Sequence, residues 1–231
     1  PGRFRLGVGP SHQPMVEGVW GIPFRRPLTH LREYLTILKA ALQQGGQVEF
    51  SGRFFQVRAD WGEPVDLQIL ASGLRRGSYE LIGELADGGI SWVTPLHHIQ
   101  RVAIPAMEEG ARRAGRPRPA MVMHVGVAVH EDAAAVREAA MRQFGFYPRV
   151  PFYSKMFVEA GYPEAAEGAM SEAMLEAILV AGDEAAVAEG LRRIAAAGVD
   201  EVICSVVAAG EDRRASAERT LRFLGDLARA D

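Results

Sequence analysis

Apolar and polar residues follow two periods along this chain, one typical of strands and one typical of helices. Between residues 3 and 9 every second residue is apolar, which predicts a strand. From residue 29 onward leucines recur at spacings of three and four, which predicts an amphipathic helix with Thr29 as its N-cap and Gly45-Gly46 as its end. The buried stripe of that helix is expected to hold Leu31, Tyr34, Leu35, Leu38 and Leu42.

The two periods continue to the end of the chain. Residues 48–57 predict a hairpin that turns at Ser51-Gly52, and residues 145–181 predict short helices at 153–160 and 171–180. Asp132 and Asp183 are N-caps for two later helices, of which the second ends at Gly198. The other predicted strands are 66–73, 89–94, 121–130 and 199–207, and the other predicted helices are 78–86, 98–113, 133–144, 184–197 and 215–229.

Strand and helix therefore alternate five times, with one hairpin inserted after the first helix. This order predicts parallel strands covered by helices, in either a doubly wound sheet or part of a (β/α)8 barrel. Five units are three short of a complete barrel. Because no compositional linker or low-complexity segment interrupts residues 1–231, we expect one domain.

Charge and composition narrow the class of protein. A net charge of -3 gives no reason to expect nucleic acid or an anionic membrane as a partner. No apolar run has the length of about 20 residues that a membrane-spanning helix needs. The single cysteine, Cys204, excludes a disulfide within the chain and suits a reducing compartment, so a cytoplasmic location is expected.

The ends of the predicted strands carry the candidate chemistry. Small residues at Gly7 and Gly9 leave room for a flat ligand, although a tight turn explains them equally well. In the stretch ASGLRRGS, a buried strand ends just before a helix that begins near Ser78. Free backbone N–H groups there, beside Arg75 and Arg76, are suited to an anion such as phosphate. The alternative is that both arginines are solvated surface residues.

The six histidines show no metal-ligand spacing, so we expect no metal site. Alternation along 121–129 places the odd residues under helices and directs His124 and His130 to the opposite face. His124 is expected to be a hydrogen-bonded interior histidine. His130 is either part of a pocket wall or a solvent-facing loop residue. Cys204 is expected to be a buried, inert thiol.

Several segments together carry a family resemblance. They are LGVGPSH, VWGIPFRRPLTHLREYLTILKAAL, VEFSGRFFQV, LQILASG and ELADGGISWVTP, in this order. As a set they resemble the bacterial luciferase-like family, and most closely its branch that uses the deazaflavin coenzyme F420. The resemblance runs from residue 3 to the end of the chain. It implies a (β/α)8 barrel in which RFRLGVG is similar to the fourth strand. On that register the chain holds strands four to eight and looks truncated at its N-terminus.

The resemblance also implies where a cofactor binds. Members of the family hold a flavin or deazaflavin across the C-terminal mouth of the barrel, with its phosphate at the loop after the fifth strand. The residues expected to bind the cofactor are Gly9, Pro10, Ser11, His12, Ala71, Ser72, Gly73, Leu74, Arg75, Trp92, Val93 and Thr94. His12 is the expected proton donor, because an imidazole titrates near neutral pH; its alternative role is to hydrogen-bond the cofactor. The loop with Trp20 and Phe24 is expected to be a lid or substrate wall, or simple packing over the mouth, and His130 joins the substrate wall.

The resemblance implies an oxidoreductase that transfers a hydride between reduced F420 and a small organic substrate. The alternatives are an FMN-dependent monooxygenase of the same superfamily and, in another class, a non-catalytic flavin-binding protein on a reduced barrel. Because five strands leave two unpaired parallel edges, we also expect the chain to form a homo-oligomer such as a dimer.

Overall fold

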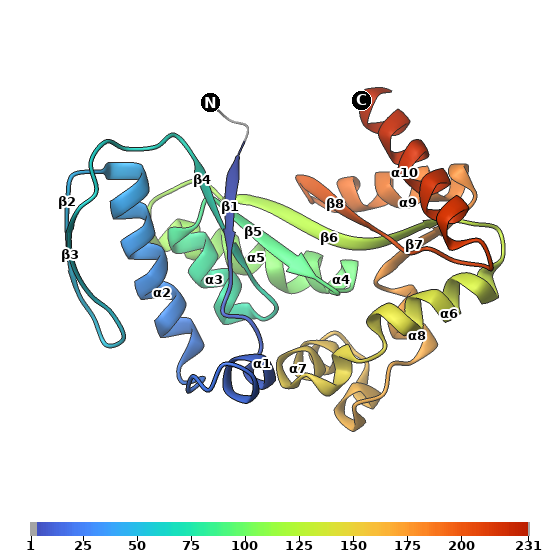
Figure 1. Cartoon of the computed structure of the whole chain (residues 1–231), viewed down its shortest axis with the longest axis horizontal. Coiled ribbons are helices and arrows are strands. Elements are labelled where there is room, and N and C mark those ends of the chain that lie inside the picture. The colour runs from blue at the N-terminus through green and yellow to red at the C-terminus, as the bar shows by residue number, and fades with distance from the viewer. Residues whose placement is uncertain (1–3, 231) are drawn as a thin grey trace. The chain divides into compact units, whose positions relative to one another are not determined.

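The computed structural model describes residues 4–230, drawn as a ribbon in Figure 1. The chain divides into two compact units. The first comprises Pro1–Ile90 and Val102–Met121, and the second comprises Ser91–Arg101 and Val122–Asp231. Each unit is described by itself.

A parallel sheet forms the centre of the first unit. Its strands are β1 (Arg5–Val8), β4 (Gln68–Ser72) and β5 (Gly88–Trp92), with β4 in the middle. Gly7 pairs with Leu70, which in turn pairs with Gly88. The strands predicted at 3–9, 66–73 and 89–94 are thus confirmed. β4 is fully buried at its three central residues, as a strand covered on both faces must be.

The helix predicted to have Thr29 as its N-cap begins three residues earlier, with Arg26 at the N-cap position. α2 spans Pro27–Leu38, and the helical path continues as a π-helical turn, η1, over Lys39–Gln44. The prediction of Thr29 as N-cap is wrong because Pro27 occupies the first turn, where its fixed φ suits a helix and its missing N–H costs nothing. Arg26 precedes it in a left-handed conformation with φ of 48°.

The predicted hairpin is confirmed as β2 (Gln47–Ser51) and β3 (Gln56–Asp60), which pair antiparallel beside α2 and η1 in Figure 1. Its turn comprises residues 52–55 and not Ser51-Gly52, because Ser51 still pairs with Gln56. Its turn is held by Glu33 of α2. The buried Glu33 carboxylate accepts the backbone N–H groups of Arg53, Phe54 and Phe55 at 2.7, 2.8 and 3.1 Å. Glu33 therefore takes a buried position, while Tyr34, predicted to be on the buried stripe, is 39% exposed.

Two helices pack on the sheet of the first unit and on each other. α3 spans Arg76–Leu85 and α5 spans Ile104–Arg113. They approach so closely that a Cβ added at Gly83 would lie 2.1 Å from the Met107 carbonyl oxygen, and one at Gly110 would lie 2.0 Å from that of Glu80. The core beneath them contains Ile69, Ala71, Tyr79, Ile82, Ala106 and Met107, each fully buried.

A second group of parallel strands forms the centre of the second unit. β6 (Ala120–Val129) pairs with β7 (Leu179–Gly182) on one side and with β8 (Glu201–Val206) on the other. β7 corrects the prediction of a helix over 171–180: the helix α8 ends at Glu176, and a short strand follows. The parallel strands therefore number six among residues 4–230, where the sequence predicted five.

The remaining elements of the second unit follow the predicted order. Asp132 accepts the N–H groups of Ala134 and Ala135, Asp183 accepts that of Ala186, and Gly198 has a φ of 90°, so these caps and this stop are confirmed. The elements are α4 (Leu96–His98), η2 (Ile99–Ala103, continuing into the first unit), α6 (Ala133–Phe144), η3 (Tyr147–Arg149), α7 (Pro151–Glu159), η4 (Pro163–Glu167), α8 (Glu172–Glu176), α9 (Glu184–Ala196) and α10 (Arg213–Ala230).

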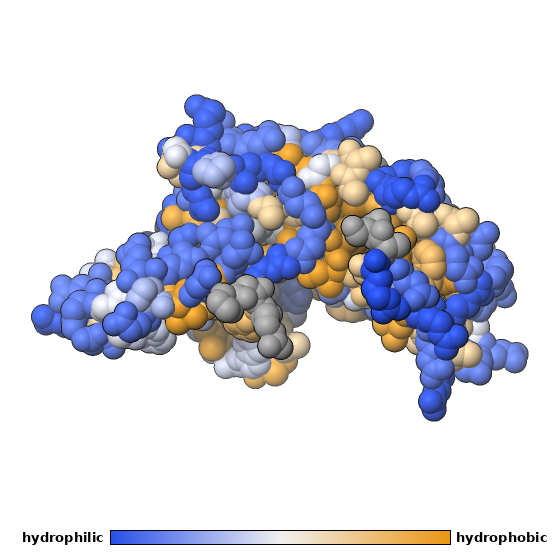
Figure 2. All heavy atoms as spheres, turned by 90° about the horizontal axis from the view of Figure 1, so that it is seen from above, coloured by the Kyte–Doolittle hydropathy of each residue, from blue (hydrophilic) through white to orange (hydrophobic). Residues whose placement is uncertain are grey.

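Figure 2 shows hydrophilic side chains over most of the face in view, with hydrophobic residues gathered in patches between them. Among residues 4–230, none of the helices combines the length and the apolar character that crossing a membrane requires.

Candidate functional site

The C-terminal ends of β1 and β4 touch. A Cβ built on Gly9 would lie 2.2 Å from Ser72 Oγ, so a side chain at this position would force the Ser72 hydroxyl to move. Ser72 is exposed, whereas Ala71 and Gly73 point to the other face, where Gly73 lies against Tyr79. Of the predicted phosphate-binding residues, Ser72 is thus the one on β4 whose side chain is open to a ligand.

The chain leaves β1 through a strained turn. Ser11 adopts a left-handed conformation with φ of 58°, which costs a non-glycine residue roughly 1–2 kcal/mol. After Pro10 and Ser11, the carbonyl of His12 accepts the N–H groups of Met15 and Val16 and so starts α1 (Gln13–Gly18). The His12 ring is half-buried, and burial lowers its pKa, which favours a neutral imidazole.

Three backbone N–H groups of the loop after β4 already donate hydrogen bonds to other groups of the protein. Gly73 N–H donates to Ile90 O at 3.0 Å, and the Leu74 and Arg75 N–H groups donate to Ser78 Oγ at 3.1 and 3.2 Å. The amides predicted to bind phosphate therefore already have protein acceptors. The amides that open α3, at Arg76 and Gly77, belong to the first helical turn, whose N–H groups have no acceptor within the helix.

The loop between α1 and α2 is tied back to α1. Glu17 accepts the Phe24 N–H at 2.9 Å and the Gln13 side-chain amide at 2.9 Å. Phe24 is half-buried, and Trp20 is 57% exposed. Trp20 is thus available to contact a ligand.

β5 continues past Ile90 into the second unit, and the residue directly after the strand is strained. Val93 is buried, yet its φ is 51°, a conformation that is costly for a β-branched side chain. The buried Thr94 hydroxyl donates to Trp92 O at 3.1 Å, which fixes this turn. Trp92, the last residue of β5, donates a hydrogen bond from its indole N–H to Tyr147 OH.

Trp92 also packs against His124 of β6, with the two ring planes tilted by 40°. The centroids of the two rings are 3.9 Å apart, and His124 Nε2 lies 2.7 Å from Ser205 Oγ of β8. His124 is half-buried, and burial lowers its pKa. The prediction of a hydrogen-bonded histidine on the even face of β6 is confirmed. Cys204, predicted to be buried, is half-buried, and burial raises the pKa of its thiol.

His130 follows β6 and is half-buried. Its Nδ1 accepts the Asp132 N–H at 3.1 Å, and its Nε2 lies so near Gly210 that a Cβ there would come within 2.8 Å. It lines a cavity of about 180 Å³ together with residues of α6 and α8. His130 therefore lines a cavity, and its place in a substrate wall stays a prediction.

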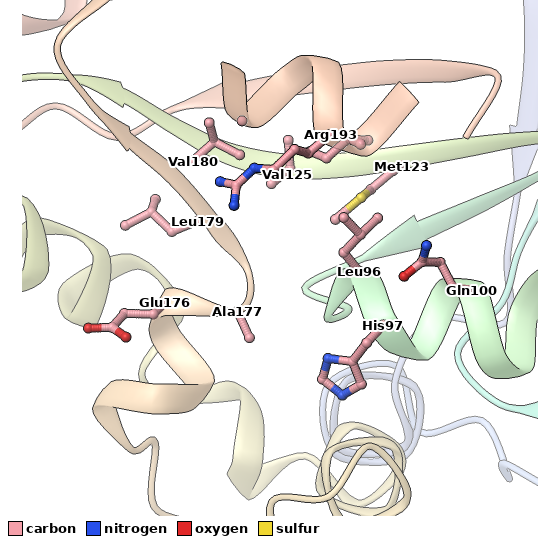
Figure 3. A pocket seen from close by; sticks show the side chains of 12 residues that line it. Leu96, His97, Gln100, Met123, Val125, Glu176, Ala177, Leu179, Val180 and Arg193 are labelled. Carbon is pink, nitrogen blue, oxygen red and sulfur yellow. The ribbon is translucent and has the colours of Figure 1, made fainter. Parts of the chain in front are cut away.

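A larger cavity, of about 320 Å³, opens on the opposite face of β6 (Figure 3). Met123 and Val125 form part of it together with side chains from α4, α8, β7 and α9. Met123 and Val125 thus lie on the side of helices α4, α8 and α9, as predicted for the odd residues. On the other face, Gly126 lies against Phe144 of α6, so a helix also contacts an even residue. In the part of the chain that the structure describes, no group of three or more His, Cys, Asp or Glu side chains is arranged to hold a metal ion.

Comparison with known proteins decides the family. The model of the luciferase-like monooxygenase family matches residues 1–201. The chain belongs to this family.

This luciferase-like chain is also similar to individual proteins and solved structures. A protein of Mycobacterium tuberculosis, described as uncharacterized, is 26% identical over 91% of this chain and 71% of its own length. An F420-dependent secondary alcohol dehydrogenase, solved with an F420-acetone adduct, has a TM-score of 0.75 and 18% identity over 97% of this chain and 70% of its own.

Two further structures share the fold. The coenzyme F420-dependent tetrahydromethanopterin reductase from Methanopyrus kandleri has a TM-score of 0.67 and 20% identity, over 94% of this chain and 72% of its own. The second is the oxygenating constituent of 3,6-diketocamphane monooxygenase from Pseudomonas putida, solved with FMN. It has a TM-score of 0.65 and 18% identity, over 96% of this chain and 69% of its own. The prediction of an α/β fold of the luciferase-like type is confirmed.

Sequence reasoning missed the partner of His124, which is Ser205, and the partner of the Trp92 indole, which is Tyr147. Neither residue lies in a recognisable motif. The parallel register supplies the signal for Ser205: His124 pairs with Ile203, so the side chain two residues further along β8 lies on the same face.

Proposed function

We propose that this chain is an oxidoreductase that transfers a hydride between reduced F420 and a small organic substrate. The cofactor supplies the redox chemistry, and the protein binds it, orients it and excludes water. Membership of the luciferase-like monooxygenase family and the fold shared with two F420-dependent enzymes support this function.

The observation that carries the proposal is the contact between Gly9 and Ser72 at the carboxyl ends of two adjacent parallel strands. Ligands of α/β proteins bind at this end of the strands. A side chain on Gly9 would collide with the Ser72 hydroxyl, so the glycine keeps this hydroxyl accessible. Beside it, the first turn of α3 offers N–H groups and the positive end of a helix dipole, which favour a phosphate.

We propose that the residues predicted from the sequence bind two parts of the cofactor, its phosphate and the remainder. Ser72, with Ala71, Gly73, Leu74 and Arg75 around it, is proposed to bind the phosphate. The other residues are proposed to contact the rest of the cofactor, and they are Gly9, Pro10, Ser11, His12, Trp92, Val93 and Thr94. Because three amides of the loop are engaged internally, we assign the direct contacts to the Ser72 hydroxyl and to the amides of Arg76 and Gly77.

His12 is proposed to exchange a proton with the substrate or to hydrogen-bond the cofactor. Its half-buried ring and lowered pKa favour the neutral form, which accepts a proton at one nitrogen and donates at the other. Trp20, Phe24 and His130 are proposed to contact the substrate.

A calorimetric titration with F420, and separately with FMN, tests the proposal. We expect saturable binding of F420. FMN-dependent monooxygenation is the second candidate, since the matching family is described as monooxygenases. It predicts that FMN binds instead and that reduced, bound FMN consumes oxygen. If neither cofactor binds more tightly than about 1 mM, both functions are wrong.

A further inference from the structure

The cavity of Figure 3 lies on the face of β6 opposite to His124, and all of its lining residues belong to the second unit. Its volume of about 320 Å³ is in the range of small-molecule sites. Most of its wall is apolar. The apolar side chains are Met123 and Val125 of β6, Leu179 and Val180 of β7, Leu96 of α4 and Ile194 of α9.

Arg193 of α9 brings a positive charge to this apolar wall. Figure 3 shows its guanidinium group extended toward Leu179 and Val180. Within residues 4–230, the Arg193 side chain forms no hydrogen bond or ion pair. Its neighbour Arg192, in contrast, pairs with Glu189 outside the cavity. The planar guanidinium of Arg193 therefore keeps its donors for a ligand, and its geometry matches a carboxylate.

The other titratable side chains that line the cavity are Glu176 and His97. In Figure 3 the Glu176 carboxylate points away from the Arg193 guanidinium, and Glu176 also lines the smaller cavity beside His130. The His97 ring donates from Nε2 to Ala160 O at 2.7 Å, since a carbonyl oxygen can only accept. Neither side chain pairs with Arg193, so its charge attracts an anion.

We propose that this cavity binds a small aliphatic monocarboxylate, with the carboxylate on the Arg193 guanidinium and the hydrocarbon chain against β6 and β7. The two halves of such a ligand match the two halves of the site. The charged fork binds the carboxylate through two parallel hydrogen bonds, and burial of the chain adds hydrophobic stabilisation. The inference goes beyond the proposed function and does not depend on it, because no residue proposed to bind the cofactor or the substrate lines this cavity.

A calorimetric titration of the whole chain with hexanoate tests the site. Hexanol and hexylamine keep the hydrocarbon chain without the carboxylate, and acetate keeps the carboxylate without the chain. We expect saturable binding of hexanoate with a dissociation constant of about 1 mM or below. Each of the other three compounds is expected to bind at least about tenfold more weakly.

Substitutions of Arg193 test which group holds the carboxylate. Arg193 is exposed on its helix, so its replacement leaves the core intact. We expect Arg193→Gln to weaken hexanoate binding at least about tenfold, and Arg193→Lys to weaken it less, because lysine keeps the charge but not the planar fork. Arg192→Gln is the matched control on the same helix and is expected to bind hexanoate like the wild type. Glu176→Gln is not expected to weaken binding.

The methyl NMR signal of Met123 shows where hexanoate binds. Met123 lines the cavity, and Met15, which is exposed on α1, is the reference in the same spectrum. We expect hexanoate to shift the Met123 signal and to leave that of Met15 unmoved. The inference is overturned if hexanoate does not bind saturably, if Arg193→Gln binds it like the wild type, if hexylamine binds as tightly, or if the Met123 signal stays in place.

Discussion

At the scale of single residues, two backbone conformations are the least expected features of the chain. Ser11 and Val93 both have positive φ, and each follows a strand of a parallel sheet at its carboxyl end. Strained residues persist where the surrounding structure holds them, and they cluster at functional sites. Hydrophobic periodicity carries no information on such residues, because it reports which side chains are buried and not which φ a turn requires.

Replacing Ser11 by glycine tests whether this strain is present. Glycine relieves the left-handed strain, which costs roughly 1–2 kcal/mol, but it also gains freedom in the unfolded chain. We expect Ser11→Gly to raise the free energy of unfolding by about 0.5–1 kcal/mol in urea denaturation. Ser11→Val is the contrasting variant and should lower it. A destabilised Ser11→Gly chain would contradict a strained turn.

Glu33 makes the stability of the hairpin depend on pH. Burial raises the pKa of Glu33, but the three backbone N–H groups that it accepts outweigh burial and lower it below 4.5. A carboxylate with a pKa lower in the folded state stabilises the protein above its unfolded pKa. This contribution is lost as the pH falls through the folded pKa.

We therefore expect Glu33→Gln to destabilise the chain at pH 7, and the difference from wild type to shrink as the pH falls below about 4.5. Denaturation midpoints in guanidinium chloride between pH 3 and 7 measure this difference. Glu49→Gln, an exposed carboxylate on β2, serves as the control. A difference that does not change with pH would show that the charge of Glu33 does not hold the turn.

At the scale of elements, the crossing of α3 and α5 depends on two glycines. A methyl group at Gly83 or Gly110 would lie 2.0–2.1 Å from a carbonyl oxygen of the other helix, so the helices must separate to admit it. We expect Gly83→Ala and Gly110→Ala each to cost about 1–3 kcal/mol of stability. Thermal unfolding measures the effect. Gly225→Ala in α10, where the nearest atoms are 4.0 Å away, is the matched control and should be neutral or stabilising.

Most elements were predictable from periodicity, because their apolar faces are long enough to show it. β7 was not: its four residues, LVAG, continue the apolar spacing of α8, so a helix and a short buried strand have the same pattern there. The start of α2 was missed for another reason. Thr29 has a good capping side chain, but Pro27 two residues earlier already has a helical φ, so the helix begins before the threonine.

At the scale of the whole molecule, the order of strands and helices points to the fold, and the comparisons establish the family. The candidate site was only partly predictable. Gly9 and Ser72 stand in the segments that carry the family resemblance, and their contact follows from the pairing of β1 with β4. The Trp92, His124 and Ser205 cluster depends on the register between strands that are 81 residues apart, which local patterns cannot supply.

The proposed function requires that the ends of these strands bind a phosphorylated redox ring. The most direct test is a fluorescence titration of the protein with F420 and with the same deazaflavin ring lacking its phosphate. We expect saturable binding of F420 with a dissociation constant well below about 1 mM, and binding at least roughly tenfold weaker without the phosphate. Equal affinity for the two compounds, or no saturable binding of F420, would contradict it.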